Sequence, residues 1–566
     1  MTSEAGVFTL LHPSLVLIAG ALLVPLFSGR ARQIYLVALP LAVLGLILSL
    51  PHGSFGAVRY LDFDLTMLRV DPLSLVFAYV FGIMIVIGAI YALHLKDNLQ
   101  HIAALIYAGS GLGVVLAGDL ITLYVFWEVM AFSSVWLIWS RGGKVSWDAG
   151  WRYVLVHAVG GVILLSGIVL YHQQTGTVSF DAILDGGPAF YLILVGFMIN
   201  AAVPPLHAWL SDAYPEATVT GAVFLSAFTT KTAVYTLIRG YPGTDLLVWF
   251  GTVMALWGVV YAVLANDIRR LLAYHIISQV GYMVAGVGMG TAIALNGAAS
   301  HAFTHILYKS LLFMGAGAVI HMTGRAKLTE LGGIYRWMPI TFLFYMVGAF
   351  SISAFPLFSG FVSKTMVVEA AAVDGRAAIW LLLSLASAGT FLHTGLKLPY
   401  FTFLGRDSGL RPQEAPVNML VAMGIAAFLC VFIGIFPGLL YALMPSPVDY
   451  NAYTLGHVLW ELQVLLFTGL AFFLLLKHVG GESKIALDTD WLYRGPGAAL
   501  GVGALGAARS ARGGALAALA VFTSGTIAYL GRHVGPEGVL GRNWPTGAMA
   551  LWTTILLAVW LMAYLI

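Results

Sequence analysis

Charged side chains are scarce in this sequence. Asp, Glu, Lys and Arg make up only 9% of its 566 residues, whereas about 25% is usual in soluble globular proteins. Hydrophobic residues make up 60%, and this balance predicts a polytopic membrane protein. The single cysteine, Cys430, lies in an apolar run, which excludes an internal disulfide bond and a cysteine-based metal site.

The sequence patterns of several chemistries are also missing. No basic cluster is interleaved with aromatic residues, so nucleic-acid binding is not indicated. The sequence has no nucleotide-binding loop, haem-ligand pattern or set of iron–sulfur cysteines. We therefore expect no cofactor, no redox chemistry in this chain itself, and no enzyme.

Apolar segments recur along the chain at the length that a bilayer requires, roughly 20 residues per crossing. The first of them lacks the basic flank and the cleavage site of a signal peptide, so we predict a retained span. The apolar segments fall at about 11–28, 34–50, 72–94, 101–118, 120–140, 152–171, 189–210, 219–239, 246–265, 271–290, 296–320, 338–373, 377–403, 416–440, 457–477 and 546–566.

Two of these segments carry helix-breaking residues in their middle. Segment 189–210 contains Pro204-Pro205, and segment 338–373 contains Pro356. Proline removes a backbone donor and clashes with the preceding helical turn. Broken helices at membrane depth occur where the freed backbone groups line a cavity or meet protein partners, so we predict two discontinuous spans.

Each predicted broken helix is the fourth of a set of five. The sets cover 101–240 and 246–404, and because five is odd the second set enters the membrane from the opposite side, as in an inverted-topology repeat. The fold prediction is an all-α polytopic membrane protein with about 14 core transmembrane helices. N-terminal helices at 1–100, C-terminal helices at 416–477, and an amphipathic extension with a last transmembrane helix at 481–566 complete it.

Basic residues gather in alternate loops. The connections after odd-numbered spans hold most of them, so the positive-inside rule places these loops in the cytoplasm and the N-terminus outside. In the tail, residues 498–531 fit two interpretations equally well: a weakly amphipathic helix lying along the interface, or a Gly/Ala-rich linker.

Three ionisable residues lie on one face of segment 296–320. His301, His305 and Lys309 recur at every fourth residue, and such positions align along one side of a helix. An ionisable group at membrane depth costs roughly 2.5–3.5 kcal/mol on insertion scales. We therefore expect the row to face other protein or a hydrated cavity and to exchange protons. No carboxylate or cysteine accompanies it, which disfavours a metal site.

Three further charges lie inside predicted spans: Glu128, Lys231 and, just beyond the second break, Lys364. We expect them to join the same proton pathway, because charges at membrane depth mark ion routes or need a partner. His157 and His207 are weaker candidates. Helix capping or a solvated loop accounts for the acids at span ends, which are Asp71, Asp148, Asp212, Glu216 and Asp267.

The motifs around these residues resemble one family over roughly residues 60 to 440. The family comprises the proton-translocating, antiporter-like membrane subunits of complex I (L, M and N) and of Mrp-type multisubunit cation/proton antiporters (A and D). The matching motifs are VDPLSLVF, FWEVM, PLHAWLSDAYPEA, KTAVYTLIRG, DIRRLLAYHIISQVGYM, HAFTHILYKSLLFMGAG and FPLFSGFVSK.

The resemblance implies roles for individual residues of the second half. By position, His301, His305 and Lys309 match the family's connecting and central groups. Lys364 matches the lysine at which the pathway ends, and a lysine there is more similar to the L and D members of the family than to the M member.

In the first half the resemblance implies one departure. Glu128 matches the glutamate that modulates the first half-channel, Lys231 matches its central lysine, and Arg269 matches a position that is often basic. The family usually has a lysine, ion-paired with the glutamate, where this chain has Asn200. An amide carries no proton. Either Glu128 uses another cation, with Lys231 the first choice, or the first half-channel is altered.

The resemblance implies a proton or cation/proton translocating subunit of a multisubunit complex in the bacterial inner membrane. Its partners would be other membrane subunits, the lipid bilayer, and H⁺ with Na⁺ or K⁺. An Mrp-type antiporter is the first hypothesis. The alternatives are a proton-pumping subunit of a complex I-like or membrane-bound hydrogenase complex, and the membrane energising partner of an inorganic-carbon uptake system, which the loss of the lysine at Asn200 keeps open.

Overall fold

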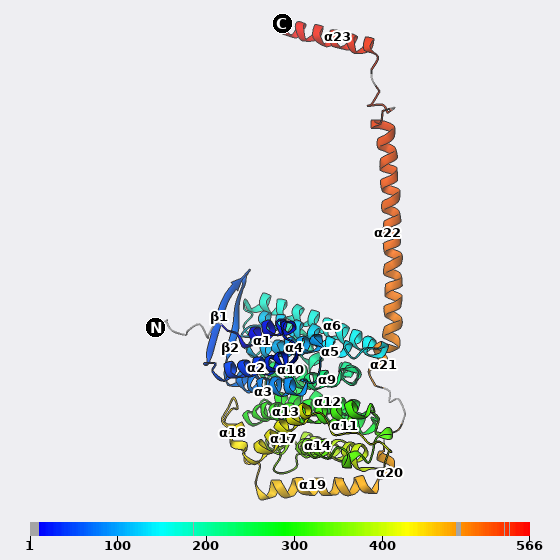
Figure 1. The fold of residues 1–566 in the computed structure, drawn as a ribbon. Helices are drawn as coiled ribbons and strands as arrows, with labels where there is room; N and C mark the ends of the chain where they lie inside the picture. Colours follow the sequence, from blue (N-terminus) through cyan, green and yellow to red (C-terminus); the bar gives the residue numbers. More distant parts are fainter. Residues whose placement is uncertain are drawn as a thin grey trace. The chain divides into compact units, whose positions relative to one another are not determined.

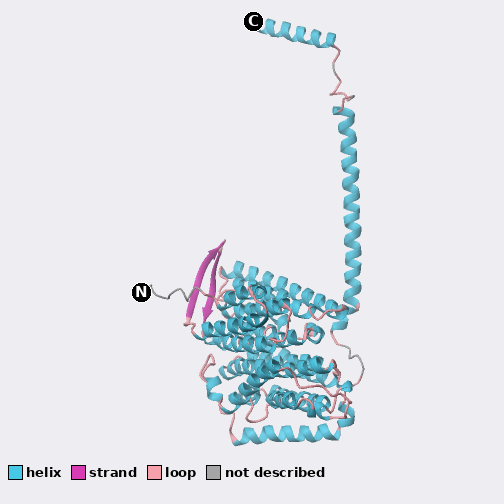
Figure 2. Cartoon of the chain, in the orientation of Figure 1, coloured by secondary structure: helices cyan, strands magenta, loops and turns pink. Residues whose placement is uncertain are grey.

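Helices make up most of the chain (Figures 1 and 2). The structure, a computed structural model, describes residues 11–184, 186–480, 482, 488–536, 538–542 and 544–565. In these ranges, 14 helices are long and apolar enough to cross a membrane, by length and composition. The predicted all-α polytopic membrane fold is therefore confirmed, with one small β-hairpin added to it.

The elements follow one another in a simple order. The N-terminal part and the first predicted set contain α1 (Pro13–Leu22), α2 (Gly29–Leu48), β1 (Gly53–Tyr60), β2 (Phe63–Val70), α3 (Pro72–Tyr91), α4 (Asn98–Leu116), α5 (Leu120–Trp139), α6 (Lys144–Thr175), α7 (Pro188–Asn200), α8 (Ala208–Ala213), α9 (Val219–Ala227) and α10 (Thr229–Gly240). The second set contains α11 (Asp245–Leu264), α12 (Ile268–Met289), α13 (Ala292–Thr323), α14 (Pro339–Ile352), α15 (Ser359–Val373), α16 (Ala377–Thr390) and the π-helical segments η6 (Phe391–Lys397) and η7 (Tyr400–Leu404). The C-terminal part contains α17 (Val417–Ile435), α18 (Pro437–Tyr441), α19 (Leu455–Leu474), α20 (Leu476–Val479), α21 (Asp490–Arg494), α22 (Pro496–Val534) and α23 (Thr546–Leu565).

The chain divides into two compact units, Met1–Asp490 and Trp491–Ile566. The second unit holds α22 and α23. Residues 498–531 lie within α22, one continuous helix of 39 residues, which agrees with the helical interpretation. Its position along the membrane interface stays a prediction. The last predicted span coincides with α23.

Helix α13 is central to the first unit, where it lies among the other green and blue helices (Figure 1). It packs against α3, α9 and α10 from the N-terminal half, and against α12, α14, α15 and α17 from the C-terminal half. The most apolar window of α13 is 94% buried, whereas that of α2 is only 22% buried. The ionisable row on α13 is therefore enclosed by protein on all sides.

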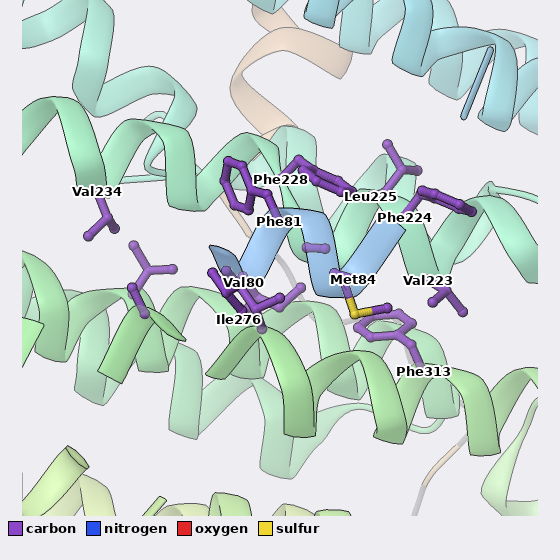
Figure 3. Close-up of a cluster of buried hydrophobic side chains, with 14 of the residues drawn as sticks. Val80, Phe81, Met84, Val223, Phe224, Leu225, Phe228, Val234, Ile276 and Phe313 are labelled. Carbon is purple, nitrogen blue, oxygen red and sulfur yellow. The ribbon is translucent and has the colours of Figure 1, made fainter. Parts of the chain in front are cut away.

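Apolar side chains fill the space between α3 and its neighbours. Figure 3 shows Phe81 and Met84 of α3 beside Phe228, with Phe313 of α13 below them. The rings of Phe81 and Phe228 have centroids 4.9 Å apart. This close packing borders the polar row and separates it from lipid on that side.

Both predicted breaks are present. The first interrupts the seventh crossing between Asn200, where α7 ends, and Ala208, where α8 begins. The second lies between Ile352, the end of α14, and Ser359, the start of α15. Proline within each interval accounts for the interruption, because it cannot continue the helical hydrogen-bond ladder.

The two breaks share one backbone geometry. Ala202 and Ala354, each two residues beyond the helix end, have φ of 58°, in the left-handed region that favours glycine. The following amides, of Val203 and Phe355, each donate over 3.1 Å to the carbonyl five residues back, as in a Schellman motif. This equivalence supports the proposal that 101–240 and 246–404 are repeats of one unit.

Three features were not predicted. Residues 53–70 form an antiparallel hairpin, with Gly53 opposite Val70 and Tyr60 opposite Phe63. The crossing at 219–239 is interrupted at Phe228, between α9 and α10. The crossing at 377–403 passes from α-helix into π-helix at η6. The interruption at Phe228 and the π-helical turn of η6 change the direction of nearby side chains, Lys231 and His393 among them.

The acids at span ends have structural roles, and two of the five are the predicted helix caps. Asp71 forms a capping box at the start of α3, and Asp267 accepts backbone hydrogen bonds at the start of α12. The remaining three form ion pairs: Asp148 with Lys144, Asp212 with Arg152, and Glu216 with Arg141.

Candidate functional site

The predicted row on α13 is completely buried. His301, His305 and Lys309 are each 0% exposed, and the rings of the two histidines have centroids 6.0 Å apart. Neither ring nitrogen of His305 has a hydrogen-bond partner among the described residues. Buried polar groups are normally paired, so an unpaired imidazole calls for a functional explanation. Because His301 and Lys309 lie one helical turn on either side of His305, the arrangement is suited to proton exchange.

The lysine of the row contacts a histidine from the next helix. Lys309 Nζ lies 3.1 Å from Nδ1 of His275 on α12, so the lysine can donate to the neutral imidazole. The His275 ring lies 5.0 Å from the ring of His393, between centroids. Nδ1 of His393 is 2.7 Å from the Thr394 hydroxyl. A lysine and two histidines from three elements therefore form one buried cluster.

Lys231 joins the row from α10. Its Nζ donates to the carbonyl of Ser226 over 2.6 Å, across the interruption at Phe228. The Ser226 hydroxyl lies 3.4 Å from that of Ser310, the neighbour of Lys309 on α13. The unpredicted break in this crossing thus gives the Lys231 amine a backbone acceptor and ties it to the central helix.

Lys364 joins the row from the second broken helix. Its Nζ donates to the carbonyl of Ile352, the last residue of α14, over 3.4 Å. The hydroxyl of the adjacent Ser363 lies 3.3 Å from Nδ1 of His301 and 2.6 Å from the Thr304 hydroxyl. The carbonyl freed by the break therefore receives the ammonium, as broken helices at membrane depth allow.

The structure thus places five of the predicted residues on α13 and on two helices packed against it, α10 and α15. Ser226, whose carbonyl accepts from Lys231, and Ser363, the neighbour of Lys364, place their hydroxyls against α13. The α13 residues follow one another at single helical turns. We call this set the central row; it consists of Lys231, His301, His305, Lys309 and Lys364.

Glu128 does not pair with Lys231. It forms no ion pair with any described residue, and its Oε1 is buried without a hydrogen-bond partner. The carboxylate packs against α6 instead, where a Cβ added to Gly161 would lie 2.0 Å from Oε1. The Glu128–Lys231 pair suggested by the sequence is therefore wrong, because the lysine amine is engaged by Ser226.

Asn200 approaches the same part of α6 from the other side. It is 1% exposed at the end of α7, and its Nδ2 has no partner among the described residues. The preceding Ile199 packs on Gly160, at 3.3 Å from an added Cβ. Gly160 and Gly161 of α6 have no side chains, so Glu128 and the end of α7 both pack against neighbouring positions of α6.

His157 lies one turn before these glycines. Its Nδ1 is 2.9 Å from the Tyr153 carbonyl, and its ring stacks on Tyr153 with centroids 4.1 Å apart. Trp209 meets the same ring edge-on at 4.5 Å. Nε2 has no partner in the described part of the chain. The residue is held firmly, with one nitrogen left for proton exchange.

His207 is bound to the tail of the first unit. Its Nε2 lies 3.1 Å from Oδ1 of Asp488, whose Oδ2 accepts a 2.7 Å hydrogen bond from the Tyr274 hydroxyl. Burial raises the pKa of Asp488, but the hydrogen bonds and the charge of His207 outweigh it and hold the pKa below its ordinary value. Asp488 is therefore bound to His207 of the first broken helix and to Tyr274 of α12.

Arg269 contacts backbone rather than the central row. Its Nη1 donates over 2.7 Å to the carbonyl of Ala217, just after the first broken helix. We interpret this arginine as a brace between α12 and that loop.

The sequence analysis did not identify several buried ionisable residues, among them His275, His393, Lys397 and Glu461. Glu461 is a lone acid within an apolar span, which is the same signal that identified Glu128. Lys397 follows His393 by one turn and donates over 3.1 Å to the Ala265 carbonyl at the end of α11. The pairing of His275 with Lys309 depends on helix packing and has no local signal.

Comparison with known proteins decides the family. Residues 117–392 match the family model described as NADH:quinone oxidoreductase/Mrp antiporter, TM. The A component of the Na⁺/H⁺ antiporter of Alkalihalophilus pseudofirmus is 32% identical over 560 residues, in an alignment that covers 84% of this chain and 69% of that protein. The chain belongs to this family. The matched region runs from just before α5 into η6, so it contains Glu128, His275 and the whole central row.

Two further matches extend the comparison. Hydrogenase-4 component B of Escherichia coli is 29% identical over 420 residues, which cover 66% of this chain and 62% of that protein. The structure of the Mrp complex from Dietzia sp. DQ12-45-1b contains a chain with the same fold, with a TM-score of 0.70 at 22% identity. The match covers 81% of this chain and 99% of that one. Members of this family thus occur in membrane complexes of several subunits.

Proposed function

We propose that this chain is the proton-translocating subunit of a multisubunit, Mrp-type cation/proton antiporter in the bacterial inner membrane. The observation that carries the proposal is the central row. Its five ionisable groups, on α10, α13 and α15, are fully buried or nearly so, at most 1% exposed. The energetic cost of such groups at membrane depth makes a structural role alone an insufficient explanation.

The row offers a sequence of proton-holding atoms. The Lys309 ammonium can pass a proton to Nδ1 of His275, and the unpaired nitrogens of His305 and His301 continue along α13 toward Lys364. Moving one charge changes the energy of the next, because Coulomb interactions are strong in a low-dielectric interior. Electrostatic coupling of neighbouring sites is then the means by which ion movement at one end drives movement at the other.

The two broken helices supply the ends of this arrangement. The second presents the Ile352 carbonyl to Lys364. The first places Asn200 near Glu128, where an amide cannot hold the charge of a lysine. We infer that the first half-channel works without a charge pair at Glu128, and that Lys231 carries its proton-holding function alone.

The driving ion is the cation that is exchanged for protons. The antiporter relatives favour Na⁺ or K⁺, with other membrane subunits as partners. A second candidate is a proton-pumping subunit of a redox-driven complex, which the similarity to Hydrogenase-4 component B favours.

A transport assay separates the two candidates. The complete complex, purified with its partner subunits, is reconstituted in vesicles that contain a pH-sensitive dye. The antiporter predicts proton movement when a Na⁺ or K⁺ gradient is imposed. Proton movement that requires an added electron donor and ignores both cation gradients would contradict the antiporter and support the redox-driven complex.

A further inference from the structure

A carboxylate that the central row does not include lies close to its terminal lysine. Glu461, at the end of the second turn of α19, is 6% exposed, and its Oε2 has no hydrogen-bond partner among the described residues. It lines the same cavity as Thr365, the residue that follows Lys364 on α15. A buried carboxylate is costly unless an opposite charge compensates it, and Lys364 supplies that charge.

Glu461 lines a cavity between α15 and α19. The cavity has a volume of about 250 Å³, and its walls include Thr365 and Glu369 of α15, and Gly456 and His457 of α19. Glu369 is 40% exposed and His457 is 18% exposed, so the cavity leads from a buried acid to the surface. It lies at the end of unit 1 where α15 ends and α19 begins, which the predicted orientation places outside the cytoplasm.

Hydrogen bonds connect the inner and outer parts of this cavity. The Tyr450 hydroxyl donates over 2.8 Å to Thr365, the residue that follows Lys364. The same hydroxyl is 3.4 Å from Nδ1 of His457, whose Nε2 is 3.8 Å from the Glu369 carboxylate. Two hydrogen bonds and one longer contact therefore lie between the residue after Lys364 and the rim.

We propose that this cavity, the α15–α19 port, is where the central row exchanges protons with the aqueous phase, and that Glu461 is the group that accepts the proton of Lys364. This role depends on the proposed function. In the first step the Lys364 ammonium gives its proton, by way of water, to the Glu461 carboxylate, which leaves a neutral amine and a neutral acid. In the second step Glu461 releases the proton to water in the port and becomes a carboxylate again. Lys364 then takes its next proton from the row.

The first test changes only the charge of Glu461. In the reconstituted complete complex, Glu461→Gln should slow cation-driven proton transport by about 100-fold, a typical contribution of a positioned proton-transfer group. Glu461→Asp, which keeps the carboxylate, should restore at least half of the wild-type rate. Glu330→Gln makes the same chemical change at an exposed turn after α13 and should transport as the wild type does. A wild-type rate in Glu461→Gln would overturn the role of Glu461.

The second test probes the port itself, in a Cys430→Ala background. A Cβ at Gly456, which lines the port, and one at Gly438, in α18, would each meet nothing within 4 Å, so both sites accept cysteine. A membrane-impermeant, charged methanethiosulfonate reagent should stop transport by the Gly456→Cys variant and leave the Gly438→Cys variant unaffected. Full labelling of Gly456→Cys without loss of transport would overturn the port. Absence of proton transport in the wild-type complex under any cation gradient would instead overturn the proposed antiporter function.

Discussion

Replacing His275 by phenylalanine should slow proton transport while leaving the complex assembled. The substitution keeps a buried ring of similar size but removes the nitrogen that lies 3.1 Å from Lys309 Nζ. A hydrogen bond to a charged group contributes about 1.5–3 kcal/mol net. Because about 1.4 kcal/mol corresponds to a tenfold change in an equilibrium constant, losing this hydrogen bond changes the ratio of charged to neutral Lys309 by roughly 10- to 150-fold.

The measurement is the initial rate of dye-reported proton movement in vesicles that contain the whole complex. His275→Asn is the matched variant: its side-chain oxygen can accept in place of Nδ1, but an amide carries no proton, so we expect its rate to lie between those of His275→Phe and the wild type. His321→Phe makes the same substitution at an exposed site at the end of α13 and should have no effect. A rate for His275→Phe within twofold of the wild type would refute the role given to this contact.

Three further substitutions test other parts of the arrangement. Asn200→Lys should restore a cation near Glu128 and change the pH dependence of transport; an unchanged profile would place position 200 outside the pathway. Gly161→Ala should displace the Glu128 carboxylate and lower the transport rate severalfold. The control is Gly45→Ala, where an added Cβ meets nothing within 4 Å, and it should not lower the rate. Equal rates for the two variants would show that Glu128 does not take part in transport. Asp488→Asn should lower the thermal stability of the purified protein by about 1–3 kcal/mol at neutral pH, because it weakens the bonds to buried partners. The pKa of Asp488 is lowered in the fold, so this difference should be present above the ordinary carboxyl value and disappear as the pH falls through the lower, folded value. A stability difference that does not change with pH would contradict this assignment.

The sequence predicts those features of the site that depend on spacing within one element. The period of four in His301, His305 and Lys309 fixes one helix face, and the burial of α13 then follows from the cost of ionisable groups in lipid. Pro204-Pro205 and Pro356 likewise determine both breaks, since proline cannot sustain the helical ladder.

Features that depend on contact between distant elements had no local signal. The approach of His275 to Lys309, and of Glu128 to Gly161, is set by how α12 packs on α13 and how α5 packs on α6. The π-helical turn that orients His393 is also absent from the apolar pattern of its segment. The hairpin at 53–70 could have been found, because FDLTMLRV alternates apolar and polar residues, which is typical of a strand.

The most direct test of the central claim is proton transport by the complete complex carrying Lys309→Ala. Lys309 is fully buried, belongs to the central row and contacts His275. The matched control is Lys327→Ala, because the Lys327 side chain is 58% exposed in the loop after α13. We predict that Lys309→Ala abolishes cation-driven proton transport in a fully assembled complex and that Lys327→Ala leaves it intact. Near-normal transport by assembled Lys309→Ala complex would contradict the claim that protons move along the central row.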